Sequence, residues 1–209
     1  MGVKERKARE FQRRELEILE TAYLLLTEME PGKMTMEMIA KEAEIGRGTI
    51  YKHFKSKDEI YANLILNRRK KYIQKLKEIK KDTDGVQCEQ KLIRSYMEYC
   101  LDDPVAFKVH KRCINHCVRD NLGPELIDAL NAQQEEKIKL VEEILRDNFN
   151  ESPEKLDDLI YYIGAGWGMQ RGAIDALLED RIEGSILEKE KYFRIVEQIL
   201  IAAFGRGKL

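Results

Sequence analysis

Apolar residues recur along most of this chain at intervals of three and four, which is the period of an amphipathic α-helix. In residues 4–29 they form one face: Ile18, Leu19, Ala22, Leu25, Leu26 and Met29. The period returns in residues 56–81 and in five further segments, which Asp-, Asn-, Gly- and Pro-rich runs separate: 86–101, 104–121, 124–148, 153–180 and 187–204. Residues 86–209 show neither the alternation typical of strands nor a repeat, so the pattern predicts an all-α fold.

Residues 35–54 are the most informative stretch, because their pattern predicts two short helices joined by a tight break. Thr35 is a good N-cap for the first helix, and Glu44-Ile45-Gly46 interrupts it. In the second helix Ile50 and Phe54 can face inward, which leaves polar residues outside: Arg47, Thr49, Tyr51, Lys52 and His53. Basic and hydroxyl side chains pair with phosphates and base edges, so this face suits a groove of DNA. The stretch is predicted to be a helix-turn-helix.

The same stretch resembles the DNA-binding motif of TetR-type transcriptional regulators. The residues that carry the resemblance are Ile39-Ala40, Ala43, Ile45, Gly48-Thr49-Ile50-Tyr51 and His53-Phe54-Lys55-Ser56-Lys57. The resemblance covers roughly residues 13–65, under a third of the chain. It implies an all-helical homodimer with an N-terminal DNA-binding domain and a larger helical-bundle domain for ligand binding and dimerisation.

Two positions depart from the family pattern. Glu44 stands where the family usually has Gly, so it must adopt a turn conformation that Gly adopts at lower cost. Gly46 stands where the family usually has Ser or Thr, so it offers no hydroxyl to a phosphate. The DNA contacts expected from the remaining positions are Arg47, Gly48, Thr49, Tyr51, Lys52, His53 and Lys57.

The helix predicted to begin at Ser56 links the two ends of the chain. Ser56 and Glu59 have the spacing of a capping box, and Lys57 in the first turn can address a phosphate together with the helix N-terminus. The predicted organisation is a DNA-binding domain at 1–55, a connecting helix at 56–81 and a ligand-binding and dimerisation domain at 82–209.

Charge is distributed unevenly along the chain. Residues 1–81 carry 20 Lys and Arg against 13 Asp and Glu, and the rest carries 17 against 25. The N-terminal basic residues are Lys4, Arg6, Lys7, Arg9, Arg13 and Arg14. Two interpretations of them stay open: a solvated helix end, with Glu10 and Glu17 placed to pair with arginines, or a phosphate or minor-groove contact beside the recognition helix.

Composition limits the remaining classes of protein. The 209 residues are 43% hydrophobic and 36% charged, with neither an uninterrupted apolar run of membrane-spanning length nor an apolar leader at the polar N-terminus. We therefore expect a cytoplasmic protein whose four cysteines are reduced. The chain has three histidines and lacks a Glu-x-x-His pair, a phosphate-binding loop and a nucleophile elbow. We expect neither an enzyme nor a cofactor.

His110, Cys113 and Cys117 share one predicted helix face and carry three open interpretations. They could converge on a soft metal ion, although three ligands in one short segment match no zinc-finger spacing. The thiols could instead sense oxidants or electrophiles. The favoured interpretation is that cysteine acts as a small core residue, so we expect no metal site.

Glycines in residues 164–172 need a reason, because each costs a helix about 1 kcal/mol relative to Ala. Gly164, Gly168 and Gly172 form one stripe, which allows another helix to approach closely, either at a dimer interface or beneath the ligand pocket. The resemblance implies that the last two helices form a dimer interface. The candidate interface residues are Gly164, Gly168, Gly172, Val196, Ile199 and Ala203.

Aromatic and thiol side chains in residues 86–209 suggest a pocket for an apolar or aromatic ligand. The candidates are Tyr96, Tyr99, Phe107, His110, Cys113, Tyr162 and Trp167. The leading hypothesis is a sequence-specific repressor that binds operator DNA as a homodimer and is released by a small molecule, with no membrane partner. The alternative is a constitutive DNA-binding or scaffolding protein on the same fold, with a filled core.

Overall fold

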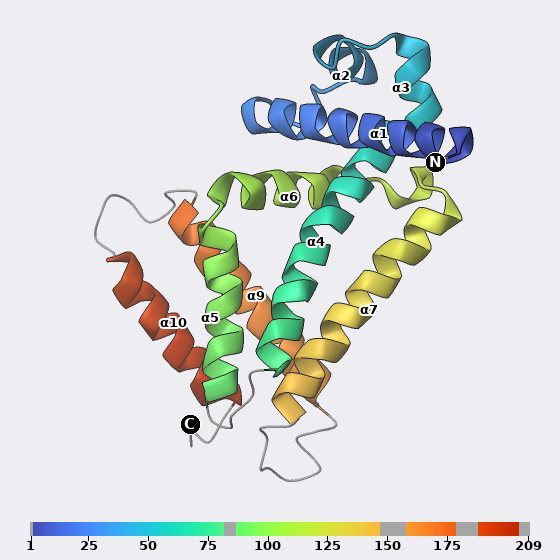
Figure 1. The fold of residues 1–209 in the computed structure, drawn as a ribbon. Coiled ribbons are helices and arrows are strands. Elements are labelled where there is room, and N and C mark those ends of the chain that lie inside the picture. The colour runs from blue at the N-terminus through green and yellow to red at the C-terminus, as the bar shows by residue number, and fades with distance from the viewer. Residues whose placement is uncertain (1, 82–86, 147–157, 179–187, 205–209) are drawn as a thin grey trace. The chain divides into compact units, whose positions relative to one another are not determined.

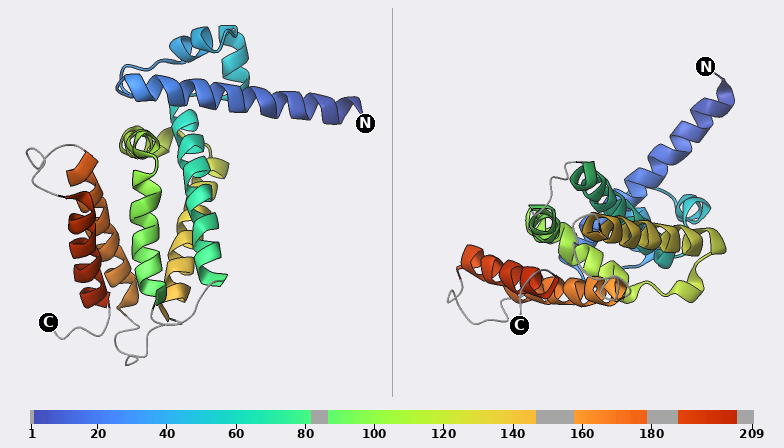
Figure 2. Two further views of the ribbon diagram at one scale, coloured as in Figure 1. Left: turned by 60° about the vertical axis from the view of Figure 1, so that its left-hand side comes forward. Right: turned by 90° about the horizontal axis from the view of Figure 1, so that it is seen from below.

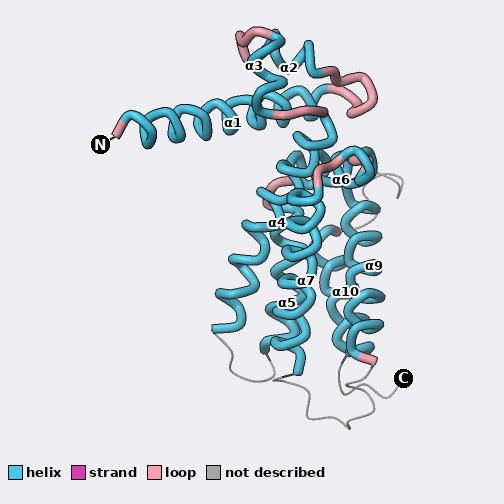
Figure 3. The backbone as a smooth tube through the Cα atoms, turned by 90° about the vertical axis from the view of Figure 1, so that its right-hand side faces the viewer, coloured by secondary structure: helices cyan, strands magenta, loops and turns pink. Residues whose placement is uncertain are grey.

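The computed structural model describes residues 2–81, 87–146, 158–178 and 188–204. Within those ranges every segment of regular structure is helical, which confirms the predicted class (Figure 3). The helices pack into two units (Figure 1). The head unit comprises Met1–Arg69 and Val105–Ala132, and the body unit comprises Lys70–Pro104 and Gln133–Leu209.

The head unit is built on α1 (Val3–Glu28), α2 (Met36–Glu42) and α3 (Arg47–His53). Their apolar faces form one core: Ile18, Leu19, Ala22, Leu26, Met36, Ile39, Ala40, Ile50 and Phe54. Thr35 caps α2 as predicted, since its Oγ1 accepts from the Met38 amide at 3.2 Å.

The break between α2 and α3 is made by a residue with a positive φ. Glu44 has a φ of 52°, and it is the one described non-glycine residue in this left-handed region. The amide of Ile45 then returns to the Ala40 carbonyl at 2.9 Å, which ends α2 as a helix normally ends before a left-handed residue. The expectation that Glu44 adopts a glycine-like turn is therefore confirmed.

α4 (Lys57–Lys81) begins with a variant of the predicted capping box. Ser56 Oγ accepts from the Glu59 amide at 3.3 Å, as expected. The carboxylate of Glu59 accepts from the amide of Lys55 at 2.7 Å, one residue before the cap, so the reciprocal bond is displaced by one position.

Asp58, also in the first turn of α4, holds a distant loop of the head unit. Its buried carboxylate accepts from the Val118 amide at 2.8 Å and from Asn121 Nδ2 at 2.9 Å. The predicted helix 104–121 is therefore shorter than expected: α6 (Pro104–His116) stops where the Val118 amide turns to Asp58, and a 3₁₀ turn, η1 (Arg119–Asn121), follows.

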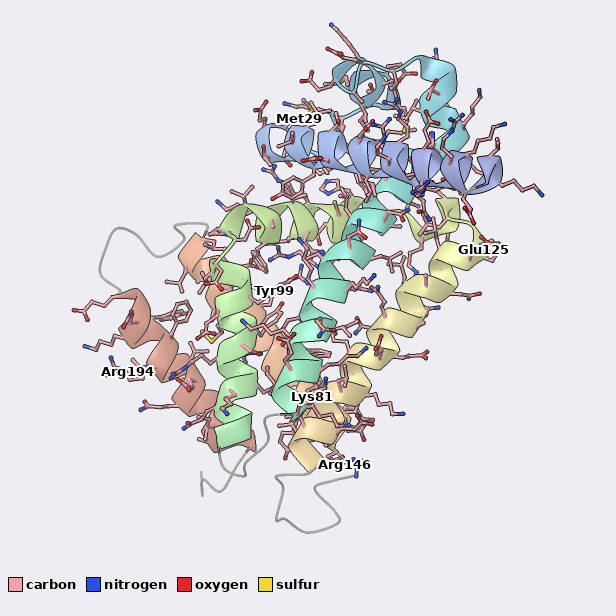
Figure 4. The ribbon with its side chains drawn as sticks, in the orientation of Figure 1. Met29, Lys81, Tyr99, Glu125, Arg146 and Arg194 are labelled. Carbon is pink, nitrogen blue, oxygen red and sulfur yellow. The ribbon has the colours of Figure 1, made fainter. Side chains whose placement is uncertain are left out.

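Arg112 of α6 binds the C-terminal end of α1. Its guanidinium donates to the Leu26 carbonyl at 2.6 Å and to the Met29 carbonyl at 3.3 Å, and pairs with Glu30 at 3.2 Å. Met29 is labelled in Figure 4. The last carbonyls of a helix have no partner within it, so Arg112 supplies a cap from another helix.

The body unit contains α5 (Gln87–Leu101), α9 (Leu159–Leu178), α10 (Lys189–Phe204), the end of α4 and most of α7 (Pro124–Arg146). α5, α9 and α10 pack against one another. The core lies among α4, α5, α7 and α9: Tyr72, Ile73, Leu76, Leu92, Leu140, Val141, Ile144, Leu145, Leu159 and Ile163. In the described helices, none is long and apolar enough to cross a membrane.

Apart from the predicted helix 104–121, the helix bounds predicted from periodicity agree closely with the described ones. The predicted parts at 86, 147–148, 153–157, 179–180 and 187 lie outside the described residues. The packing units differ from the predicted domains 1–55, 56–81 and 82–209, because Val105–Ala132 packs with the head. The predicted domains stay a prediction.

Candidate DNA-binding surface and neighbouring sites

The outward face of α3 is set by two inward anchors. Ile50 and Phe54 are buried in the head core and fix the inward face of α3. Arg47, Tyr51 and Lys52 are exposed, which agrees with their predicted orientation. This short helix therefore exposes a guanidinium, a phenol and an ammonium group, the groups that bind phosphates and base edges.

Arg47 is held in place by two neighbours. Its side chain is 72% exposed, its Nη2 lies 3.0 Å from Glu37 Oε1 of α2, and its Cζ lies 5.9 Å from the centre of the Tyr51 ring. An exposed ion pair contributes little to stability, about 0–1 kcal/mol, so its main effect here is to orient the guanidinium. The periodicity of the sequence did not predict the ion pair between Arg47 and Glu37, because this pair joins two helices across a turn.

His53 differs from its predicted place on the DNA face. Its side chain is only 7% exposed. The ring packs against Phe11 of α1 with ring centroids 4.0 Å apart, and its Nδ1 lies 3.9 Å from Glu15 Oε1. The reason is geometric: His53 is three residues after the buried Ile50, so it shares the inward face of α3.

The other predicted DNA contacts lie around this face. Thr49 and Lys57 are half-buried, and Gly48 is exposed. A Cβ added to Gly48 would meet no atom of the chain within 4 Å, so the fold itself does not require glycine there. A glycine on an open helix face does permit a close approach by a ligand backbone. Apart from the orientation of His53, the predicted contacts stay predictions.

The predicted ligand-binding residues do not gather in one place within either unit. Tyr96, Tyr99 and Trp167 pack against the body core, whereas Cys113 belongs to the head core. Phe107 is buried and His110 half-buried on the same helix as Cys113, and Tyr162 is exposed. Spacing along a helix showed which residues share a face but not which unit that face joins.

A small apolar cavity lies in the body unit beside Trp167. It measures about 20 Å³, and its wall includes Tyr72, Val141, Leu145 and Gln170. Such a volume holds about one water molecule. Gln170 is buried and donates to the Ile93 carbonyl at 2.8 Å, so the wall has one oriented polar group. Of the predicted ligand-binding residues, Trp167 alone lines this cavity.

A wider, open groove of about 340 Å³ runs between α5 and α10. Its lining mixes charged and apolar side chains: Arg94, Met97, Glu98, Leu101, Glu190, Phe193, Arg194 and Glu197. Arg194 is labelled on α10 in Figure 4. Arg94 and Glu197 already pair across the groove at 2.8 Å, and no predicted ligand-binding residue lines it.

Cys113 of α6 and Cys117, just after the end of α6, have the properties of core residues. Burial raises the pKa of the Cys113 thiol to about 12, and burial followed by the nearby Asp58 carboxylate raises the pKa of Cys117. A thiol with a raised pKa is a weak nucleophile at neutral pH, because the thiolate is the reactive form. Among the described residues, no three His, Cys, Asp or Glu side chains are grouped to hold a metal ion.

The predicted dimer residues fall into two groups. Gly164, Gly168 and Gly172 are exposed, and a Cβ added at any of them would meet no atom of the chain within 4 Å. Ile199 is 48% exposed, whereas Val196 is buried within the body unit, and the place of both in a dimer interface stays a prediction. The side chain of Ala203 lies outside the described residues.

Comparison with known sequences finds a family match within the head unit. Residues 18–64 match the family described as bacterial regulatory proteins, tetR family. The HTH-type transcriptional regulator SAB2452 of Staphylococcus aureus (strain bovine RF122 / ET3-1) is 31% identical over 101 residues, which are 48% of this chain and 51% of that protein. The chain thus spans about half the length of the curated relatives it matches.

Solved structures share the fold over both units. The TetR family transcriptional regulator PfmR from Thermus thermophilus is 20% identical, with a TM-score of 0.65 over 90% of this chain and 99% of that chain. The transcriptional regulator FadR from Bacillus subtilis, in complex with stearoyl-CoA, is 16% identical, with a TM-score of 0.62 over 90% and 98%. At these identities the likeness shows the fold alone.

The capped α2, the tight turn and the outward face of α3 form a helix-turn-helix. Residues 18–64 of this head are the part of the chain that matches the tetR family of bacterial regulatory proteins.

Proposed function

We propose that this protein is a sequence-specific transcriptional repressor that binds operator DNA as a homodimer and is released by a small apolar or aromatic ligand. The observation that carries DNA binding is the face of α3, where Arg47, Tyr51 and Lys52 project from a helix anchored by Ile50 and Phe54. A protein that binds an operator acts where the chromosome lies, so we place it in the cytoplasm.

Selection of duplexes from a random-sequence pool by the purified protein tests DNA binding. Tyr51→Ala should weaken binding to the selected duplex, and Lys57→Ala should in addition reduce the slope of log affinity against log salt by about 0.9, the loss of one phosphate contact. Lys191→Ala, at an exposed position of α10, removes the same charge and serves as the control. If both head variants bind as tightly as the wild type, this assignment of the DNA face is wrong.

Release by a ligand is supported by a structural neighbour, FadR, whose crystal structure is a complex with stearoyl-CoA. In this chain the cavity beside Trp167 is the place in the body unit where apolar walls and an oriented polar side chain meet. A drug-sized ligand needs about 300–1,000 Å³, far more than the 20 Å³ present. Ligand binding here therefore requires the body helices to separate, and that movement is what could change the affinity for DNA.

The same small volume favours the second candidate function, a constitutive DNA-binding or scaffolding protein. A panel of uncharged compounds with one or two aromatic rings can distinguish the two. A repressor of the proposed kind should have at least one compound that raises the melting temperature and weakens operator binding by about 5–150-fold, the usual range of allosteric coupling. A panel in which no compound has both effects favours the constitutive protein.

Two substitutions locate any such ligand. Leu145→Phe enlarges a side chain of the cavity wall and should abolish the thermal shift while operator binding persists. Leu140→Phe makes the same change on α7 in the body core, outside the cavity lining, and should retain the shift. If both variants keep the shift, the ligand binds somewhere other than this cavity.

A further inference from the structure

α1 continues well beyond the part that packs on α2 and α3. Its buried residues all lie between Ile18 and Leu26, and residues 2–13 are exposed throughout. Figure 2 shows the N-terminal half of α1 extending past α3. Residues 3–14 contain six basic and two acidic side chains, a net charge of +4. The chain's own core does not account for such a segment, because it buries nothing there.

One aromatic contact fixes the orientation of this segment. Phe11 packs against His53 at the C-terminal end of α3, with ring centroids 4.0 Å apart. One turn further along α1, Glu15 Oε1 lies 3.9 Å from His53 Nδ1. Two contacts one turn apart determine which face of α1 continues beyond the end of α3.

Helical spacing places Lys4 and Lys7 on that face. Residues four and seven apart share one side of a helix, so Lys7, Lys4 and the core residue Ile18 align with Phe11. At a rise of 1.5 Å per residue, Lys4 lies about 10 Å along the helix axis from Phe11. With phosphates spaced about 3.4 Å per strand along the duplex, this distance corresponds to about three base pairs.

We propose that Lys7 and Lys4 bind backbone phosphates of the DNA about two and three base pairs, respectively, beyond the end of α3. The inference rests on the proposed function, because α3 must lie in a groove for its flank to meet a strand. Lysine binds phosphate as a point charge and carries no sequence information. The segment therefore raises the affinity for DNA and the salt dependence of DNA binding, whereas the preference for particular DNA sequences comes from α3.

The opposite face of α1 provides a matched control. Arg6 and Arg13 point away from the line of Phe11 and Ile18, and both are exposed. Lys4→Gln/Lys7→Gln and Arg6→Gln/Arg13→Gln each remove two positive charges from the same helix. Long-range attraction to DNA changes equally in the two variants, so a difference between them reports direct contact.

The experiment measures fluorescence anisotropy of the full chain on the duplex that the wild type selects and on an unselected duplex, from 50 to 200 mM KCl. For Lys4→Gln/Lys7→Gln we expect the slope of log affinity against log salt to fall by about 1.8 on both duplexes, at about 0.9 per phosphate contact. Over this fourfold change in salt, that slope difference amounts to about twelvefold in affinity. Arg6→Gln/Arg13→Gln should stay close to the wild-type slope.

Equal slopes for the two variants would overturn the inference and leave the segment a solvated helix end. Lys4→Arg/Lys7→Arg should keep the wild-type slope, which separates loss of charge from loss of helix. A wild type that selects no sequence contradicts the proposed function instead, so the two failures are distinguishable. Because all four substituted residues are exposed, the melting temperatures of the variants should coincide.

Discussion

At the scale of single residues, Glu44 shows a local conflict that the chain tolerates. Its φ of 52° lies in the left-handed region, where a side chain with a Cβ costs about 1–2 kcal/mol. Glycine relieves this strain but loses more freedom on folding, about 0.5–1 kcal/mol. We expect Glu44→Gly to raise the free energy of unfolding by about 0.5 kcal/mol, the difference between these two effects. Urea denaturation followed by circular dichroism measures it.

Glu20→Gly is the control for that change. Glu20 is exposed in the interior of α1, where glycine should lower the free energy of unfolding by about 1 kcal/mol. Glycine at the two positions should therefore act in opposite directions. A destabilised Glu44→Gly variant would show that the left-handed turn is not a source of strain.

Other single residues show the limit of what could be predicted. Thr35 and Glu44 were predictable because a cap and a turn depend on neighbours along the chain. The spacing of three residues from Ile50 places His53 on the inward face of α3, whereas its aromatic partner, Phe11, lies 42 positions earlier and no periodic signal indicates it. The predicted outward orientation of His53 was wrong because a polar residue type does not by itself indicate a solvent-facing position.

At the scale of elements, the first turn of α4 depends on a loop far along the chain. The Asp58 carboxylate is the partner of the Val118 amide, 60 positions later, and of the Asn121 side chain. Removing it deprives two partly buried donors of their acceptor, which costs about 1–3 kcal/mol. We expect Asp58→Ala to lower the free energy of unfolding by that amount, measured by urea denaturation.

Asp120→Ala removes a carboxylate of the same type from η1, where the residue is exposed, and should change stability by less than about 0.5 kcal/mol. Equal stability of the two variants would mean that the Asp58 bonds do not hold the loop.

The helices themselves were predictable from the 3.6-residue period. The elements against which each helix packs were not predictable. An apolar face indicates that a helix side must be buried but does not indicate which element covers it.

At the scale of the whole molecule, the glycine stripe of α9 bears on assembly. Gly164, Gly168 and Gly172 are exposed and unobstructed, beside exposed Met169 on the same helix. The described part of the chain gives these glycines no packing role, whereas a second copy brought against them would. We therefore expect a homodimer in sedimentation velocity experiments at micromolar concentration.

Gly168→Leu should dissociate that dimer without unfolding the chain. A Cβ at this position meets nothing within 4 Å, so leucine fits the isolated chain and obstructs only an approaching helix. Gly168→Ala should retain the dimer and gain about 1 kcal/mol of helix stability. A monomeric wild type, or a dimeric Gly168→Leu variant, would remove α9 from the interface.

The contacts of Arg112 and Asp58 have a consequence for how such proteins can be recombined. The core of the head includes Val109, Cys113, Leu122 and Leu130, which the chain supplies long after the recognition helix. An exchange of the first 81 residues between two regulators would transfer the proposed DNA-binding surface without the part of its core that residues 105–132 supply. We therefore expect a working chimaera to require residues 105–132 as well.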